Sequence, residues 1–361
     1  QTDQNQMTKV YCNAPWTSVS YMPGGKYLPC CAYGGPGFDT REEMTEKIGG
    51  AFLRDEVPRE CLGSCQPNQA GWRDGFSRFD TDYKTHQIKY LDFRNNNLCN
   101  MKCRSCGPGF STSWASEAKH TSIVLHESVV MDDMDLSQCE QVYFAGGEPL
   151  LNPQHYAVLG KLIAQGSRPV LMYSTNTSVL GYKDQHVKDY WPNFDRINVH
   201  SSIDAVGKFA EVVRSGTVWT DVDANLTWLR SQPNVLLRIA TVISAINIWF
   251  LPSLLEYFDW LDDPHVFEPV LANVDSVIGL GSIPYRYRDA LLEVLTNSRF
   301  NKHYNMLRAI DALKEKNYNQ ENWYRFLSQQ LIQDNYRNEN WFDLLPIKHE
   351  VYREAMQIGN R

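Results

Sequence analysis

The sequence has no run of about eighteen uninterrupted apolar residues, the length that a membrane-spanning helix requires. Its most apolar stretch, residues 235–255, is interrupted by Arg238, Asn247 and Pro252. The first ten residues are polar and lack the apolar segment of a signal peptide. We therefore expect no membrane partner and a cytoplasmic location.

Dense clusters of lysine and arginine are also missing, and the formal net charge is −7. Proteins that bind nucleic acid neutralise phosphates with basic side chains, so we expect no nucleic-acid partner. No repeat or low-complexity tract stands out in the sequence.

Cysteine, by contrast, is abundant, with nine residues in a chain of 361. Five lie between residues 12 and 65, three lie between residues 99 and 106, and Cys139 stands alone. Disulfide frameworks belong mainly to small secreted domains, so clustered thiols in a reducing compartment favour metal or metal–sulfur ligation. We expect Cys139 to be a small buried hydrophobic residue.

Short apolar segments alternate with helical ones from about residue 87 onward. The strand candidates are 88–94, 141–147, 169–175, 196–202, 235–244 and 265–271. The helix candidates are 109–120, 152–166, 182–190, 205–214, 219–231 and 249–260. This alternation predicts an α/β fold with a parallel sheet or barrel, and in such a barrel the chemistry lies at the carboxyl ends of the strands.

The two ends of the chain differ from this middle part. Residues 1–85 are irregular, with short strand signals, an amphipathic segment at 41–55 and too little apolar periodicity for a good core. A metal centre would substitute for that core. Residues 282–361 are largely helical in pattern and are expected to pack against the barrel. We predict three regions, 1–85, 86–281 and 282–361.

The segment CNMKCRSC places Cys99, Cys103 and Cys106 on a loop after the first strand candidate. Thiolates are soft ligands that suit zinc and iron–sulfur clusters. Three thiolates can hold three irons of a [4Fe–4S] cube, which leaves the fourth iron open to a small chelate such as the amino-acid end of methionine. The alternative is a zinc site that a distant residue completes.

Together with AGGEPLL at residues 145–151, this segment resembles the radical S-adenosylmethionine (SAM) superfamily. In that family three cysteines bind a [4Fe–4S] cluster, and SAM chelates the open iron. The resemblance implies a partial (β/α)6 TIM-like barrel with Cys99, Cys103 and Cys106 as metal ligands. It also implies that the Gly-Gly-Glu segment contacts the SAM amino group, through Gly146, Gly147 and Glu148. The alternative for the glutamate is a solvated loop carboxylate.

Three further segments resemble parts of the same family. They imply additional SAM contacts from Thr175, Asn176, Ser202, Arg214 and Ser244. A turn-forming asparagine and an ordinary helix-surface arginine are the alternatives for positions 176 and 214. His200 and Asp204 flank the serine at 202, but structural roles are open for both, and we assign no general acid or base. Ser105 departs from the family, which has a bulky or aromatic residue before the last cysteine.

The remaining cysteines lie in two segments, 12–31 and 60–78, that resemble the auxiliary-cluster module called SPASM or twitch, placed here before the barrel. Four thiolates complete one [4Fe–4S] cluster. We expect these ligands to be Cys12, Cys30, Cys61 and Cys65. Cys31 is the neighbour of Cys30, and because adjacent side chains usually point apart, one of the two is spare. Zinc and a [2Fe–2S] centre are the alternatives.

The resemblance predicts a radical SAM enzyme of the oxidoreductase or maturase type. Such an enzyme cleaves SAM to a 5′-deoxyadenosyl radical, which abstracts hydrogen from a substrate. A peptide or protein side chain is our first choice of substrate, and flavodoxin or ferredoxin is the expected electron donor. The alternatives are a sugar or small metabolite as substrate, a non-enzymatic iron–sulfur carrier or scaffold, and a zinc-stabilised binding protein.

Overall fold

The computed structural model describes residues 11–65, 75–117, 134–258, 267–298, 301–302, 304–315 and 318–359. The chain forms two compact units. Unit 1 comprises residues 1–98, 123–174 and 181–198, and unit 2 comprises residues 99–122, 175–180 and 199–361. These units are not the three regions expected from the sequence, whose boundaries stay a prediction.

The main sheet of the described residues has eight strands, in the order β12-β11-β9-β6-β5-β3-β1-β2. Their bounds are β1 (Ser18–Met22), β2 (Lys26–Leu28), β3 (Tyr90–Phe93), β5 (Gln141–Phe144), β6 (Val170–Thr175), β9 (Ile197–Ser202), β11 (Val235–Ile243) and β12 (Phe267–Leu271). From β3 to β12 the strands follow chain order, as in a (β/α) barrel. All six strand candidates are present, and the predicted α/β class with a mostly parallel sheet is confirmed.

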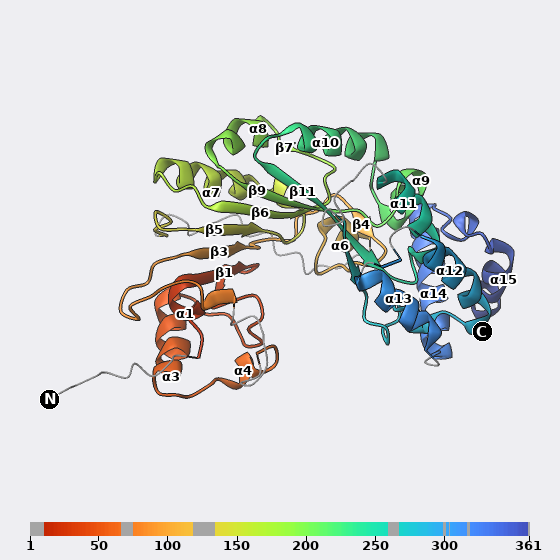
Figure 1. The fold of residues 1–361 in the computed structure, drawn as a ribbon, viewed down its shortest axis with the longest axis horizontal. Coiled ribbons are helices and arrows are strands. Elements are labelled where there is room, and N and C mark those ends of the chain that lie inside the picture. Colours follow the sequence, from red (N-terminus) through yellow and green to blue (C-terminus); the bar gives the residue numbers. More distant parts are fainter. Residues whose placement is uncertain are drawn as a thin grey trace. The chain divides into compact units, whose positions relative to one another are not determined.

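In unit 1, alternate residues of β3, β5 and β6 face opposite sides of the sheet. Leu91, Val142 and Leu171 are in register and fully buried on one face. Helix α7 (Pro153–Ala164) covers this face, and the ring of its His155 lies 4.6 Å from the ring of Phe144. Figure 1 shows α7 on this side of β5 and β6. The opposite face carries Asp92, Tyr143 and Met172, which are also in register.

Residues 11–65 extend this sheet. Strand β1 pairs in parallel with β3, with Ser20 opposite Asp92, and forms a hairpin with β2 through Gly24 and Gly25, whose φ angles are +99° and +69°. Only glycine adopts such angles at little cost. The short helices of this part are α1 (Ala14–Thr17), α2 (Arg41–Met44), the π-helix η1 (Thr45–Gly49), α3 (Gly50–Leu53) and α4 (Arg59–Leu62).

One helix prediction in unit 1 was wrong over part of its length. Residues 182–190 were expected to be helical, but α8 covers only Val187–Tyr190. The preceding residues form a small hairpin of β7 (Gly181–Tyr182) and β8 (Gln185–His186). The hairpin turns at Lys183, whose φ is +55°, and a backbone in this left-handed region cannot continue into a helix.

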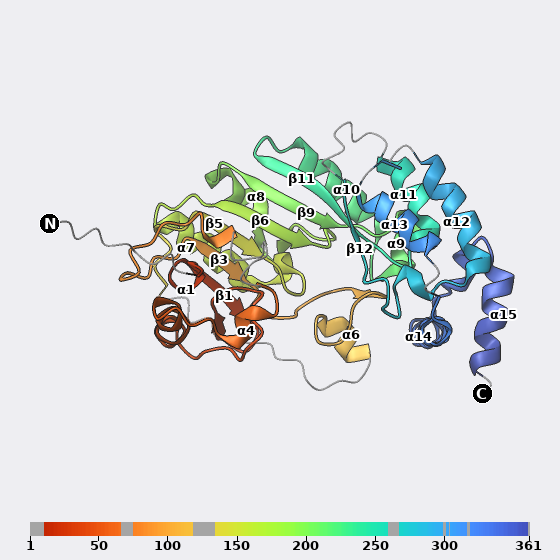
Figure 2. The ribbon, with the colours of Figure 1, turned by 60° about the horizontal axis from the view of Figure 1, so that its bottom comes forward.

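Unit 2 contains two short paired strands, β4 (Lys102–Cys103) and β10 (Arg214–Ser215), and most of the helices. The helices of its described residues are α6 (Thr112–Glu117), α9 (Gly207–Val213), α10 (Trp219–Ser231), α11 (Leu251–Tyr257), α12 (Tyr285–Asn297), α13 (Tyr304–Lys314), α14 (Gln320–Arg337) and α15 (Lys348–Gly359). Figures 1 and 2 show α12 to α15, coloured blue, as one group, which confirms the predicted helical extension. Trp323, Phe326 and Trp341 are fully buried in this group.

Among the described residues, no helix combines the length and the apolar character that crossing a membrane requires.

Candidate functional site

The three-cysteine loop, residues 99–106, lies in unit 2 and is held from two directions. Strand β4 places Cys103 directly opposite Arg214 of β10. At the start of α6, Thr112 Oγ1 accepts from the Cys99 amide at 3.2 Å, and the Ser113 hydroxyl donates to the Cys99 carbonyl at 2.8 Å. The loop is thus held by the β4–β10 pairing and by hydrogen bonds to its backbone.

Cys103 is buried, and burial raises the pKa of its thiol to about 11. The positive charge of Arg214 lowers this pKa, whereas the neighbouring Cys99 and Cys106 raise it because thiolates close to one another repel. Three mutually repelling thiolates are not stable without a cation between them. A metal–sulfur cluster removes this cost, so the donor set of the loop fits such a group.

Two side-chain nitrogens of Arg214 differ in their hydrogen bonding among the described residues. Its Nη1 donates to Asp204 Oδ2 at 2.8 Å, whereas its Nε is buried and has no hydrogen-bond partner among the described residues. Its side chain is only 16% exposed, so it is not an ordinary helix-surface arginine. Burial lowers the pKa of Arg214, but the charges of Cys103 and Asp204 more than offset this and raise it. A buried donor without a partner is costly, so this nitrogen fits an anionic group of a ligand.

Asn176 also lies at the cysteine loop. Its Nδ2 is 4.0 Å from Cys99 Sγ and donates to Asn100 Oδ1 at 2.9 Å, while its Oδ1 accepts from the Ser178 amide. Asn176 therefore stabilises a turn and also places its side-chain amide beside Cys99. The turn contains Thr177 at φ +60°, an angle that is strained for a β-branched residue and that recurs at functional sites.

The other expected SAM contacts of unit 2 have different surroundings. Ser202 is half-buried at the end of β9, and Thr175 Oγ1 accepts from the Thr177 amide at 3.0 Å. The Ser244 hydroxyl is buried and bonds within its own turn, to Asn247 Oδ1 at 3.1 Å. Asp204 accepts from the Val242 amide at 2.9 Å as well as from the arginine, which gives it a structural role. The SAM roles of these serines and this threonine stay predictions.

The Gly-Gly-Glu segment lies in unit 1, at the end of β5. A Cβ at Gly147 would be 2.2 Å from the carbonyl oxygen of Leu98, and one at Gly146, whose φ is +113°, would be 2.7 Å from that of Asn96. The Glu148 amide donates to the Leu98 carbonyl at 2.6 Å. Leu98 directly precedes Cys99. Glycine is needed at 146 and 147 because the backbone there lies against the segment before the cysteine loop, with no room for a side chain.

Glu148 is buried, with 1% of its surface exposed, which contradicts the alternative of a solvated loop carboxylate. One carboxylate oxygen accepts from the Leu150 amide at 3.1 Å and so caps the short 3₁₀-helix η2 (Pro149–Leu151). A carboxylate buried at a strand end suits an ammonium group.

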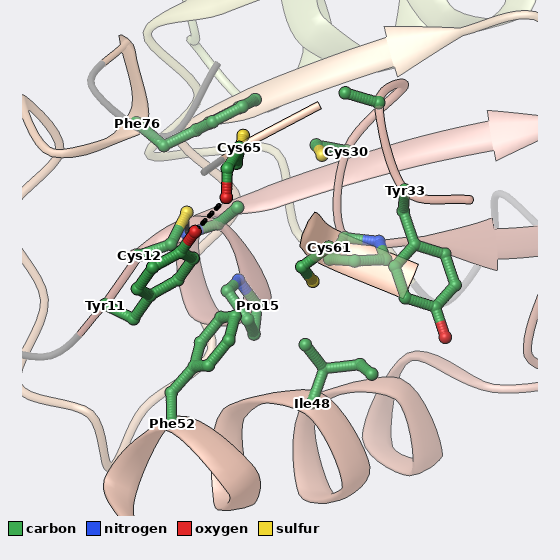
Figure 3. A pocket seen from close by; sticks show the side chains of 13 residues that line it. Tyr11, Cys12, Pro15, Cys30, Tyr33, Ile48, Phe52, Cys61, Cys65 and Phe76 are labelled. Atoms are coloured by element: carbon green, nitrogen blue, oxygen red, sulfur yellow. Dashed lines mark hydrogen bonds between the residues drawn. The ribbon is translucent and has the colours of Figure 1, made fainter. Parts of the chain in front are cut away.

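Four of the five N-terminal cysteines line one pocket of unit 1: Cys12, Cys30, Cys61 and Cys65. Figure 3 shows the first and last of these on one side of the pocket and the middle two on the other. The rest of the lining is apolar or aromatic and includes Ile48, Phe52 and Phe76, and the space measures about 380 Å³ including open solvent. The Ala14 amide donates to Cys12 Sγ at 3.4 Å.

Electrostatics shows that these thiols interact. The pKa of Cys30 is raised to about 12, mainly by burial and to a lesser extent by the nearby Cys12, Cys31 and Cys65. The pKa of Cys61 is likewise raised to about 12, mainly by burial and to a lesser extent by Cys30 and Cys65. Cys30 and Cys61 are therefore protonated near neutral pH when no metal is bound. Such a donor set in an apolar pocket fits a metal–sulfur cluster, which binds thiolates and excludes water.

Cys31 does not line this pocket. Its thiol interacts with Asp92, a buried carboxylate of β3 that accepts from Arg94 Nε at 2.7 Å and from the Ser20 hydroxyl at 3.2 Å. Burial, followed by the charge of Asp92, raises the pKa of Cys31. Of the two adjacent cysteines, the structure thus brings Cys30 to the pocket and leaves Cys31 beside the sheet.

Sequence reasoning missed the charged residues in and beside the cysteine loop that form ion pairs, above all Arg104, Glu117 and Arg337. Arg104 lies within the CNMKCRSC segment but is not one of the residues that define it, and the contacts of Arg104 with Asp334 and of Arg337 with Glu117 join residues more than 200 positions apart. Cys139 is buried, as expected. Among the described residues, no group of three or more histidine, cysteine, aspartate or glutamate side chains is arranged to hold a single metal ion.

Residues 95–210 match the family model of a 4Fe-4S single cluster domain, which agrees with the prediction of such a cluster in this segment. The match includes the three-cysteine loop and the Gly-Gly-Glu segment. No curated protein matches the sequence. A solved structure described as native anSMEcpe with bound AdoMet is similar, with 16% identity and a TM-score of 0.42. The similarity covers 67% of this chain and 66% of that one, just under two thirds of its length.

Proposed function

We propose that this protein is a radical SAM enzyme with two iron–sulfur clusters. Cys99, Cys103 and Cys106 hold the first cluster, and the four-cysteine pocket holds an auxiliary one. With SAM on its open iron, the first cluster supplies the electron that splits SAM into methionine and a 5′-deoxyadenosyl radical, which abstracts hydrogen from the substrate. The cluster-domain match over residues 95–210 supports the proposal.

The observation that carries the proposal is the buried, unpartnered Nε of Arg214 beside three interacting thiols. Arg214 neutralises part of the thiolate charge and directs its free donor toward the carboxylate of SAM, while Asp204 holds the guanidinium in place. The amide of Asn176 lies at Cys99 and orients the same ligand. Glu148 accepts from the SAM amino group, and Ser202 contributes at the ribose or carboxylate.

Anaerobic reconstitution tests this function. The protein is loaded with iron and sulfide, reduced with dithionite and given SAM, and 5′-deoxyadenosine is quantified. We expect release from the wild type, and loss of release from Cys103→Ser. The matched control is Cys139→Ser, which alters a buried cysteine outside both cysteine groups and is expected to keep the activity.

Two results would overturn the proposal. If both clusters form and no 5′-deoxyadenosine appears, the protein is an iron–sulfur carrier or scaffold. If the purified protein contains zinc and no acid-labile sulfide, it is a zinc-stabilised binding protein.

We further propose that the substrate is a peptide or protein side chain, that flavodoxin or ferredoxin is the electron donor, and that the reaction occurs in the cytoplasm. The resemblance to proteins with auxiliary-cluster modules supports the substrate class, and the acidic chain without basic clusters agrees with a partner other than nucleic acid. The neighbouring genes provide a test. A short precursor peptide encoded next to this protein would favour the proposal, whereas sugar-nucleotide enzymes would replace it with a carbohydrate substrate.

A further inference from the structure

Arg104 connects the cysteine loop (residues 99–106) to the C-terminal helices within unit 2. Its side chain is fully buried. Nη1 donates to Gln330 Oε1 of α14 at 3.1 Å, and Nη2 forms ion pairs with Asp334 and, at 2.8 Å, with Glu339. All three of these acceptors lie within residues 282–361, for which the sequence predicted only helices that pack against the barrel.

A second, partly buried network also joins the cysteine loop to α14. Glu117 at the end of α6 forms ion pairs with Lys102 of the loop and with Arg337 of α14, both at 2.9 Å. The guanidinium of Arg337 lies over the ring of Trp114, at 5.5 Å. That indole in turn donates to the carbonyl oxygen of Cys103 at 3.2 Å. Arg337 of α14 is thus connected to the backbone of Cys103 through the side chain of Trp114.

We infer that α14 and the residues after it, as far as Glu339, position the cysteine loop for cluster binding. The inference rests on the proposed function, because it takes the three cysteines as cluster ligands. The loop has little regular structure of its own, since β4 and β10 share only two residue pairs. A buried charge that loses its partner is strongly destabilising, so loop conformations that break these ion pairs are excluded. Arg104 and Arg337 are therefore positioning residues.

The test compares Arg104→Gln with Arg288→Gln, in which a second buried arginine of the same unit is lost. Arg288 donates to the carbonyl oxygens of Ile283 and Glu315, both at 2.8 Å, and these acceptors are remote from the cysteine loop in the chain. Hydrogen exchange of residues 99–106 is measured on the full chain without iron. We expect exchange there to be faster in Arg104→Gln than in either the wild type or the control.

The second readout is the electron paramagnetic resonance signal of the reduced, reconstituted protein. Only a cluster with an open iron changes its signal when SAM is added, which separates it from the auxiliary cluster. We expect the SAM-sensitive signal of Arg104→Gln to fall about tenfold, the loss typical of residues that orient metal ligands. Arg104→Lys keeps a positive charge beside the carboxylates of Asp334 and Glu339. We therefore expect it to retain part of the SAM-sensitive signal that Arg104→Gln loses. Glu339→Gln, at a less buried position, is the milder variant if Arg104→Gln does not fold.

Equal exchange at residues 99–106 in Arg104→Gln and the wild type, or equal loss of the SAM-sensitive signal in both glutamine variants, would overturn the inference. A wild type that shows no SAM-sensitive signal would instead overturn the proposed function. In that case the exchange comparison still decides whether α14 positions the loop.

Discussion

Cys30 and Cys31 are neighbours in the chain but lie in different surroundings. Cys30 lines the four-cysteine pocket, and Cys31 interacts with the buried Asp92 of β3. Both residues lie in a turn, in which the Cys30 carbonyl accepts from the Tyr33 amide at 3.2 Å. The local turn conformation therefore determines which of the two thiols is the proposed auxiliary ligand.

We expect Cys30→Ser to lose the auxiliary cluster and Cys31→Ser to keep it, because only Cys30 has the other three thiols as neighbours. Iron and acid-labile sulfide per chain after anaerobic reconstitution measure the difference. Equal iron loss in the two variants would contradict the assignment.

Gly147 offers a test of the close approach at the Gly-Gly-Glu segment. A methyl group there would meet the Leu98 carbonyl oxygen at 2.2 Å, so the backbone must shift. We expect Gly147→Ala to lower the free energy of unfolding by about 1–3 kcal/mol, as overpacking of a tight site does. Urea unfolding measures this change.

The matched control is Gly160→Ala in the interior of α7, where an added Cβ meets nothing within 4 Å. Alanine is the better helix former, so this variant should gain about 0.5–1 kcal/mol. A loss of stability at residue 160 as large as that at residue 147 would show that the contact with the loop is not the cause.

At the scale of elements, α7 packs on β5 and β6 through an aromatic cluster around His155. The imidazole is fully buried between the rings of Phe144 and Tyr156, and its Nε2 lies 2.9 Å from the Tyr173 hydroxyl. Burial lowers the pKa of His155 to about 3, because no counter-charge compensates for the lost hydration of the imidazolium. The helix is therefore anchored by a histidine that must stay neutral.

This anchor predicts a pH dependence of stability. In the unfolded chain the pKa of a histidine is about 6.5, so between about pH 3 and 6.5 the unfolded state binds one more proton than the folded state at this residue. The free energy of unfolding must then fall as the pH falls. Between pH 8 and pH 5 we expect a decrease of about 2 kcal/mol from His155 alone.

Urea unfolding of the wild type and His155→Gln at pH 8 and pH 5, in the same metal state, isolates this contribution. Glutamine does not titrate, so the stability of the wild type should fall by that amount more than the stability of the variant. Two parallel pH profiles would show that the histidine is not buried in its neutral form.

For the whole molecule, the two cysteine groups have different structural surroundings. The cysteine loop is held by ion pairs to α14, whereas the four-cysteine pocket is enclosed by short helices and turns within residues 11–65, together with Phe76. Short elements contribute few backbone hydrogen bonds, and metal binding then supplies part of the folding energy. The auxiliary cluster should accordingly matter most for the order of this part of unit 1.

We expect removal of iron by a chelator under oxidising conditions to increase hydrogen exchange in residues 12–31 and 59–65. Helix α7 of the same unit, whose core is aromatic, should keep its protection. Mass spectrometry of exchanged peptides measures both segments in one experiment. An equal loss of protection in α7 would mean that the cluster supports the whole unit.

The sequence alone was sufficient to predict the strands of the barrel and the two cysteine groups. Segments such as Val170–Thr175 and Ile197–Ser202 alternate buried and half-buried residues, and this alternation is a local property that survives in the linear sequence. The spacing of Cys99, Cys103 and Cys106 is local in the same sense. The hairpin at Gly181–His186 escaped prediction because a single left-handed residue, Lys183, decides it.

The contacts that these residues make were determined only by the tertiary structure. The pairing of Cys103 with Arg214, the choice between Cys30 and Cys31, and the contact of Arg104 with Asp334 join residues that are far apart in the chain or differ only in direction. Such contacts depend on how distant segments fold onto each other, and no spacing or periodicity records them. The cysteines proposed as ligands could therefore be chosen from the sequence, whereas the residues that hold the cysteine loop and alter the pKa of its thiols could not.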